Sequence, residues 1–277
     1  MRYTLYFILT IQLFLFSCSP KKILINQDFI VSIYFNNKIS KLKKIQDPSL
    51  QNLQNLMRTH IEYGYGIIME KSDRLIESDY SYAISNYKIA FLHFNSARLI
   101  GTKILTSKYV NFEEWLNNEV NIIFSKSDVS DLYWLAAAYG GSISSSRGNP
   151  YELIHLPLVS KILQTCILLD PKWGDGSLYS AMMSYTSTRS DLNNQDLKDS
   201  INHYYKKSLL LSDSLDASLF VSYAELVHKP AQEKERFNHK LNIALKVKSS
   251  KKYELINLIA KKRAKWLLSN TEEYFLE

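Results

Sequence analysis

The chain has 277 residues, enough for one large domain with a sizeable hydrophobic core or for two small ones. Proline and glycine are scarce, with 6 and 8 copies, and leucine is common, which together favour helices. We find no sustained Val/Thr alternation of the kind that strands need. The formal net charge is +7, but the lysines are scattered and do not alternate with aromatic residues, which argues against a nucleic-acid partner.

The N-terminus has the pattern of an export signal. Arg2 supplies a positive charge, and the apolar run that follows is too short to span a bilayer as a permanent helix. The run ends with Leu-Phe-Ser before Cys18, which is similar to a bacterial lipobox, where the cysteine is lipidated and becomes the first residue of the mature protein. Residues 1–17 are therefore predicted to be a lipoprotein signal peptide, and Cys18 the lipidation site that anchors the protein to a membrane. An ordinary signal peptide or a short membrane anchor is the alternative.

The remaining chain is expected to contain one helical domain. Residues 18–49 are predicted to form the lipidated N-terminus, a tether and a short helix, and residues 50–277 a single domain with tetratricopeptide-like repeats. From Leu50 onward, apolar residues recur three and four positions apart, with breakers at helix-length intervals. Gly101 is expected to end a helix, and Pro230 to lie in the first turn of another. This pattern predicts roughly ten helices.

Several segments resemble one another in the manner of tetratricopeptide repeats. The Leu-Leu-Asp-Pro sequence that ends at Pro171 is typical of the junction between two repeats, and a similar texture returns before Ser212 and again after Phe237. We therefore expect an all-α fold in which antiparallel tetratricopeptide-like helix pairs stack into a compact right-handed solenoid. An irregular helical bundle is the alternative, because leucine at helical spacing is most often core.

The sequence shows no pattern of catalytic or metal-binding residues. Its six histidines are dispersed, and none has a partner at metal-ligand spacing. His155 and Cys166, if they share a helix, would lie about 16 Å apart, too far for proton transfer. We predict that the protein is not an enzyme and holds neither a metal nor a cofactor. A hydrolase of lipids or cell-wall glycans is the least supported alternative.

One stretch carries a resemblance to a known family. DLYWLAAAYGGSI, a polar loop and then LPLVSKILQTCILLDPKWGDGSLY are similar to the TatT family, the tetratricopeptide-repeat lipoproteins associated with tripartite ATP-independent periplasmic (TRAP) transporters and first recognised in spirochaetes. Most of the similarity lies between Asp131 and Tyr223. The resemblance implies a non-enzymatic protein that is lipid-anchored in the bacterial envelope, on the inner or outer membrane, and faces the periplasm. It also implies a homotrimer, binding to the solute-binding subunit, and a pore or groove for a hydrophobic or amphipathic ligand. A scaffold or adhesin lipoprotein that binds another envelope protein is the alternative.

The tetratricopeptide register predicts which side chains pack and which line a groove. With Trp134 at the fourth position of a repeat, Ala137 and Ala138 pack against neighbouring helices, and Pro171 marks the repeat junction. The stripe one residue further on faces the concave side, where an uncharged wall suits an apolar ligand or a partner's helix. The predicted groove-lining residues are Leu135, Tyr139, Ser142, Tyr179, Met183, Thr186 and Phe220. An apolar stripe at this spacing is also typical of residues buried in a hydrophobic core. Arg147 lies in the adjoining loop, where it either binds the acid headgroup of a ligand or is exposed to solvent.

Overall fold

The computed structural model describes residues 28–276, and within this range every regular element is helical, which confirms the predicted all-α class. The predicted signal peptide, Cys18 and the start of the tether lie outside the described residues. The α-helices are α3 (Asp28–Lys43), α4 (Leu50–Tyr63), α5 (Glu70–Leu75), α6 (Tyr80–Lys108), α7 (Phe112–Leu116), α8 (Val129–Ser145), α9 (Pro150–Leu153), α10 (Leu156–Leu169), α11 (Ser177–Thr186), α12 (Asn194–Leu211), α13 (Ala217–Tyr223), α14 (Lys234–Lys246) and α15 (Glu254–Ser269). The π-helical turns are η1 (Gly64–Met69) and η4 (Ala224–His228), and the 3₁₀ turns are η2 (Lys126–Asp128), η3 (Trp173–Gly176), η5 (Lys251–Tyr253) and η6 (Thr271–Glu273).

Several helices begin where a short polar side chain caps the first turn. The Ser49 hydroxyl accepts a hydrogen bond from the backbone N–H of Asn52 at 3.3 Å, at the start of α4. The carboxylate of Asp79 accepts from the N–H of Tyr82 at 3.1 Å, at the start of α6. Asn193 caps α12 in the same way. Each cap satisfies a backbone donor that the helix itself leaves unpaired, and so sets where the helix starts.

Two helix boundaries differ from those predicted. Gly101 lies inside α6 and does not end a helix. A Cβ atom there would come within 2.8 Å of the Met57 sulfur and 3.1 Å of Leu135 Cδ1, so this glycine permits close packing between helices. Pro230 lies in a turn, and α14 begins later, at Lys234. In both cases a residue that breaks helices in isolation has a tertiary role or a turn position that the sequence does not reveal.

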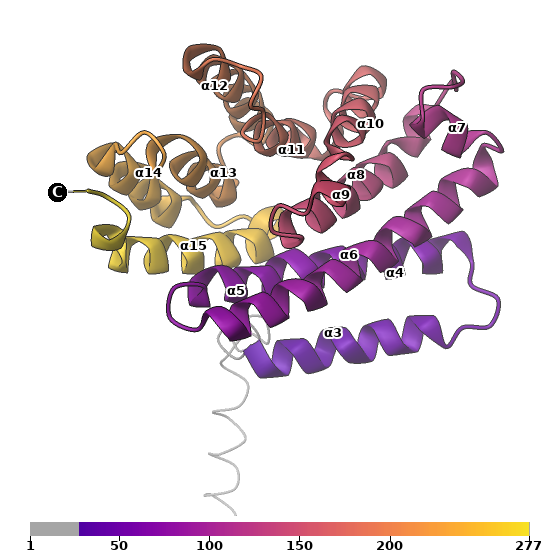
Figure 1. Ribbon diagram of the computed structural model, residues 1–277, viewed down its shortest axis with the longest axis horizontal. Coiled ribbons are helices and arrows are strands. Elements are labelled where there is room, and N and C mark those ends of the chain that lie inside the picture. The colour runs from indigo at the N-terminus through magenta and orange to yellow at the C-terminus, as the bar shows by residue number, and fades with distance from the viewer. Residues whose placement is uncertain (1–27, 277) are drawn as a thin grey trace, which may run out of the picture.

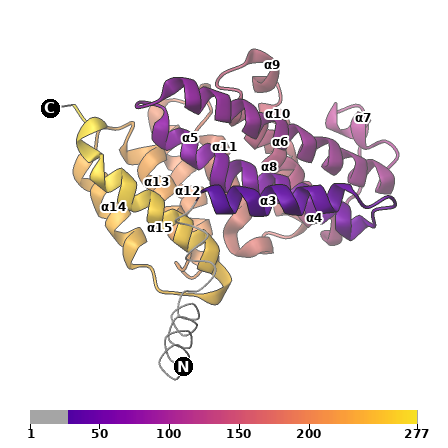
Figure 2. The same ribbon diagram turned by 90° about the horizontal axis from the view of Figure 1, so that it is seen from below.

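Helices that follow one another in the chain pack side by side, in agreement with the predicted helix pairs (Figure 1). Helix α4 contacts α6, α6 contacts α8, α8 contacts α10, α11 contacts α12, and α13 contacts both α14 and α15. Helix α3 lies along the outer side of α4 (Figure 2). The stacking of these helix pairs into a compact right-handed solenoid stays a prediction.

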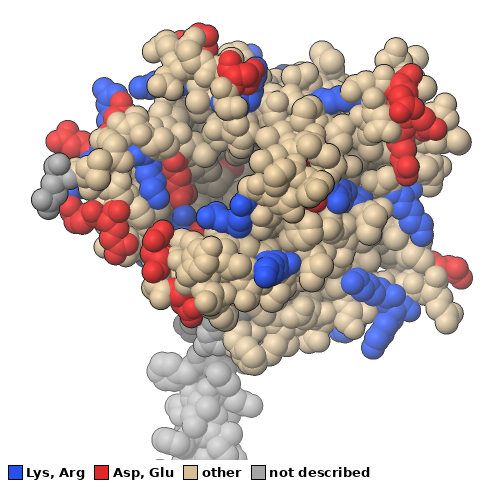
Figure 3. All heavy atoms as spheres, in the orientation of Figure 1, with Lys and Arg blue, Asp and Glu red and all other residues tan. Residues whose placement is uncertain are grey.

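The hydrophobic core runs through the molecule as three clusters. One is built mainly from α4, α6 and η1, a central one from α7, α8, α10 and α11, and a C-terminal one from α12 to α15. The row of helices curves, so that α15 comes back above α5 (Figure 1), and residues of both helices line one pocket. The face seen in Figure 3 is hollowed, in the region where Figure 1 has α13 on one side and α9 on the other. The curvature therefore brings the C-terminal helices back to the first half of the chain.

Candidate functional site

The Ala- and Gly-rich stretch of the sequence forms the middle of α8, where its small residues admit large side chains from other helices. A Cβ atom on Gly141 would come within 2.3 Å of the Phe94 ring, which is fully buried in α6. A Cβ atom on Gly140 would lie 3.3 Å from the Tyr65 hydroxyl. That hydroxyl donates a hydrogen bond to the carbonyl of Ala137 at 3.2 Å. The small residues of α8 therefore hold the Phe94 ring and the Tyr65 hydroxyl in place. Tyr65 is also part of the site described below.

The four residues predicted to pack occupy different environments. Ala138 is fully buried in the N-terminal core cluster, and Trp134 and Ala137 are partly buried against that cluster. The guanidinium of Arg58 lies 5.2 Å from the centroid of a Trp134 ring, so the indole also stacks with a cation. Pro171 is exposed, in the turn that follows α10.

The stripe predicted to line a groove lies in the interior. Its seven members are at most 8% exposed: Leu135, Tyr139, Ser142, Tyr179, Met183, Thr186 and Phe220. Leu135 and Tyr139 belong to the central core cluster, and Met183 and Phe220 to the C-terminal one. None of the seven lines either of the two pockets described below. Burial in the interior is the alternative that the sequence left open, and the groove-lining role stays a prediction.

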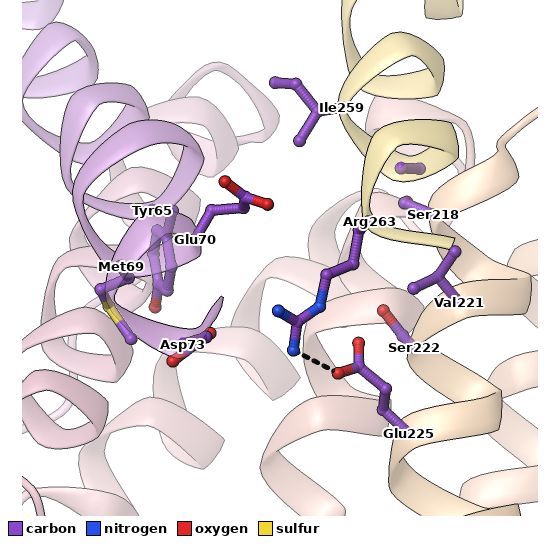
Figure 4. Close-up of a pocket in the computed structure, with 11 residues that line it drawn as sticks. Tyr65, Met69, Glu70, Asp73, Ser218, Val221, Ser222, Glu225, Ile259 and Arg263 are labelled. Carbon is purple, nitrogen blue, oxygen red and sulfur yellow. Dashed lines mark hydrogen bonds and ion pairs between the residues drawn. The ribbon is translucent and has the colours of Figure 1, made fainter. Parts of the chain in front are cut away.

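A crevice of about 210 Å³ lies where the C-terminal helices return to the first half of the chain. One wall comes from η1 and α5, and the other from α13, η4 and α15 (Figure 4). Its lining residues are Tyr65, Met69, Glu70, Asp73, Ser218, Val221, Ser222, Glu225, Ile259, Ala260 and Arg263. We call this site the crevice.

Both π-helical turns found among the described residues contribute to the crevice. Tyr65 and Met69 belong to η1, and Glu225 belongs to η4. In a π-turn the backbone bonds to the fifth residue along, as the N–H of Lys229 does to the carbonyl of Ala224 at 2.9 Å. Such turns are rare and are found frequently at functional sites, because they re-aim side chains at some cost to the helix. Two of them on opposite walls mark the crevice as the candidate functional site.

Charged groups meet across the crevice. Arg263 extends from α15 between the two walls and forms an ion pair with Glu225 at 2.6 Å (Figure 4). Its Nη1 atom is buried and has no hydrogen-bond partner among the described residues. Asp73 lies on the opposite wall, where burial raises the pKa of its carboxyl, against the lowering effect of a hydrogen bond donated by Tyr87. A buried guanidinium with a free N–H is suited to an acceptor oxygen supplied from outside.

Arg147 extends this polar cluster beyond the crevice. It lies in the loop after α8 with a left-handed φ of 54°, and its side chain is exposed. Its guanidinium stacks over the ring of Tyr87, 4.9 Å from the centroid. Because Tyr87 donates its hydroxyl hydrogen to Asp73, Arg147 supports one wall of the crevice from outside.

One pair of histidines that lie in contact was not predicted from their spacing in the sequence. His60 and His93 are 33 residues apart, yet their Nδ1 atoms lie 2.8 Å from each other, because α4 packs on α6. Burial lowers the pKa of His60 to about 3 and that of His93 to about 4, so both rings are neutral at pH 7. One ring must then donate and the other accept. No local signal in the sequence distinguishes these two from the other histidines.

The side chains considered for chemistry do not assemble into a reactive centre. Cys166 is buried, and burial raises the pKa of its thiol to about 12, which leaves almost no thiolate at neutral pH. His155 lies at the start of α10 and contacts the ring of Tyr139. The part of the chain that the structure describes contains no group of three or more His, Cys, Asp or Glu side chains able to hold a metal ion.

Comparison with known proteins places the chain in a family. The model of the TRAP transporter T-component family matches residues 43–275, which spans every helix from α4 to α15 and both walls of the crevice. The chain belongs to the TRAP transporter T-component family. This confirms the resemblance found in the sequence, and membership indicates an accessory role in a TRAP transporter of the cell envelope. A search of curated proteins found no match.

Proposed function

We propose that this T component is a lipid-anchored, periplasm-facing accessory protein of a TRAP-type transporter that binds the solute-binding subunit and a hydrophobic or amphipathic ligand. The observation that carries the proposal is a family match that extends over both walls of the crevice. The anchor at Cys18 rests on the lipobox-like sequence. Catalysis has no place in the proposal, because family membership points to transport.

The crevice suits a small amphipathic ligand. Met69, Val221 and Ile259 supply apolar wall, and Arg263 supplies a buried N–H without a partner. A ligand with a neutral acceptor oxygen, such as an amide, ester or hydroxyl, would accept from that N–H and lay its apolar part on the other side chains. A carboxylate is disfavoured, because Glu70, Asp73 and Glu225 also line the crevice. A volume of about 210 Å³ is small for a binding pocket, so the crevice holds a small ligand or one end of a longer one.

An exposed stripe on α6 supports the proposed homotrimer. Tyr82, Ile89, Leu92 and Leu99 are between 41% and 73% exposed. They follow one another at intervals of seven, three and seven residues, the spacing of a coiled-coil seam, which favours packing against another helix. We propose that this α6 stripe packs against other copies of the chain. Large apolar side chains in a row on one helix need such a cover.

The oligomer proposal is tested by sedimentation of the full-length protein in detergent. Leu92→Glu and Leu99→Glu are each expected to shift the trimer towards monomer, because a carboxylate would be buried at the contact. Ile123→Glu is the matched control, since Ile123 is 95% exposed in a loop away from the stripe. A monomeric wild-type protein, or trimers that persist in both stripe variants, would contradict the proposed contact.

The functional proposal is tested by co-expression with the solute-binding subunit of the transporter. We expect the two proteins to co-purify, and we expect a ligand released on denaturation to be detected by mass spectrometry. Arg263→Met should reduce the retained ligand, while Lys265→Met, an exposed change on the same helix, should not. Failure of the wild-type protein to retain the subunit would overturn the transport role, and equal ligand in both variants would overturn the crevice as its site.

A further inference from the structure

A second pocket lies between α12, α13, η4 and α14, and it shares no lining residue with the crevice. Its volume is about 330 Å³. Tyr205 and Tyr223 form part of its wall, with ring centroids 4.2 Å apart. Its cationic side chains are Lys206, Arg236 and Lys240, and its lining includes no carboxylate. We call this site the basic pocket.

Lys240 is a partly buried charge in the basic pocket without a counter-ion among the described residues. Its ammonium donates a hydrogen bond to the Tyr205 hydroxyl at 3.2 Å and lies 5.0 and 5.1 Å from the ring centroids of Tyr205 and Tyr223. The described residues place no carboxylate within ion-pair distance of it. Burial lowers the pKa of Lys240, as expected for a desolvated cation without a counter-charge.

The other cations of the pocket are only partly neutralised. Arg236 pairs with Glu233 at 2.9 Å, but the same carboxylate also contacts His228 at 2.6 Å and Lys198 at 3.5 Å. Lys206 forms no ion pair within the described part of the chain. One carboxylate shared between two cations, Arg236 and Lys198, leaves an excess of positive charge around the pocket.

We propose that the basic pocket binds a small oxyanion, a carboxylate or a phosphate, carried on an apolar body. Lys240 meets the anion from within, and Lys206 and Arg236 meet it from the exposed side. The apolar body rests on the Tyr205 and Tyr223 rings and on the alkyl stems of the lysines. Charge-assisted hydrogen bonds from ammonium and guanidinium groups are the usual means of holding such anions. This site is independent of the transport role proposed above.

One other account of Lys240 makes the opposite prediction. The two tyrosine rings and the Tyr205 hydroxyl stabilise an ammonium group without any ligand, by cation–π attraction and a hydrogen bond. If they are its only partners, added anions will not bind there. Titration therefore separates the two accounts.

The test is isothermal titration calorimetry of the full-length protein in detergent. The probes are phenylphosphate and phenylacetate, with benzyl alcohol as a probe that lacks the anion, and mixed micelles of the detergent with phosphatidylglycerol to distinguish a lipid headgroup from a free anion. We expect phenylphosphate, phenylacetate or the phosphatidylglycerol micelles to bind, and Lys240→Met to weaken that binding about tenfold or more. Lys206→Gln, an exposed change that leaves the fold intact, should weaken it in the same direction. Lys207→Gln, the exposed neighbour outside the pocket, should change it less than about twofold.

The overturning results are equally definite. No binding of any anionic probe up to about 10 mM would show that the rings alone satisfy Lys240. Binding of benzyl alcohol as tight as that of phenylphosphate would also overturn the proposal, because the anion would then contribute nothing to affinity. If both Lys240→Met and Lys206→Gln have the circular dichroism spectrum of the folded protein and bind the anionic probes with unchanged affinity, any bound anion lies outside the basic pocket.

Discussion

Gly141→Ala tests whether the Ala- and Gly-rich stretch is there to admit the Phe94 ring. The new Cβ atom would lie 2.3 Å from one ring atom and 2.4 Å from another. The ring cannot move easily, because it is fully buried and its far end, at Cζ, lies against Gly64, where an added Cβ would come within 2.6 Å. The substitution therefore forces the two helices apart or the ring out of its preferred rotamer.

The expected cost follows from two opposing effects. Overpacking a buried site costs about 1–3 kcal/mol, with this contact at the upper end because the ring is already in close contact with both Gly141 and Gly64. Alanine in place of glycine in a helix returns up to about 1 kcal/mol. The net loss of unfolding free energy is then about 2 kcal/mol, which lowers the melting temperature by roughly 4–8 °C in a chain of this size.

The assay is thermal and urea unfolding followed by circular dichroism. Gly140→Ala is the matched control on the same helix, because its Cβ would meet only the Tyr65 hydroxyl, at 3.3 Å. This control should melt close to the wild type or above it. Gly141→Ala combined with Phe94→Leu should recover part of the loss. If Gly141→Ala is as stable as Gly140→Ala, the close approach of the ring does not constrain α8, and the reasoning is wrong.

Three further predictions concern the buried polar groups. The pKa values of His60 and His93 are lower in the folded protein than in the unfolded chain. The free energy of unfolding therefore has its full value above about pH 6.5 and decreases as the pH falls, because protons bind the unfolded chain first. For His60 the decrease is about 2 kcal/mol between pH 7.5 and pH 5. Unfolding at both pH values measures it, and His60→Phe, which removes that titrating ring, should flatten the dependence. Asp131→Ala removes a buried partner 2.7 Å from the Lys108 ammonium and should cost about 2–3 kcal/mol in urea unfolding; no change would mean that Lys108 needs no second carboxylate. Arg263→Met should reduce retained ligand and lower the free energy of unfolding by about 1–3 kcal/mol, because it leaves the Glu225 carboxylate without its ion pair. Retained ligand equal to that of the wild type would contradict its binding role.

The all-helical structure was predictable from the sequence because it depends on the spacing of apolar residues over a few positions. The apolar residues three and four apart act within a few residues, and α4 begins at Leu50 as the pattern indicates. Gly101 was predicted wrongly because its role is tertiary. Its helix cost of about 1 kcal/mol is offset by contact with Met57 and Leu135, which lie on other helices.

The crevice was not predictable from the sequence. It depends on the curvature of the whole row of helices, which brings Arg263 to the wall that carries Asp73, far away in the chain. Two π-turns shape its walls, and such turns leave no clear trace in composition. The repeat register instead pointed to a stripe such as Leu135 and Met183, which the structure places in core clusters.

Native mass spectrometry of the protein extracted from membranes in mild detergent tests the transport account most directly. The account predicts a homotrimer whose chains begin at a lipidated Cys18 and which retains a small amphipathic molecule, lost in Arg263→Met and kept in Lys265→Met. A bare monomer that still carries residues 1–17 and retains no ligand would contradict it.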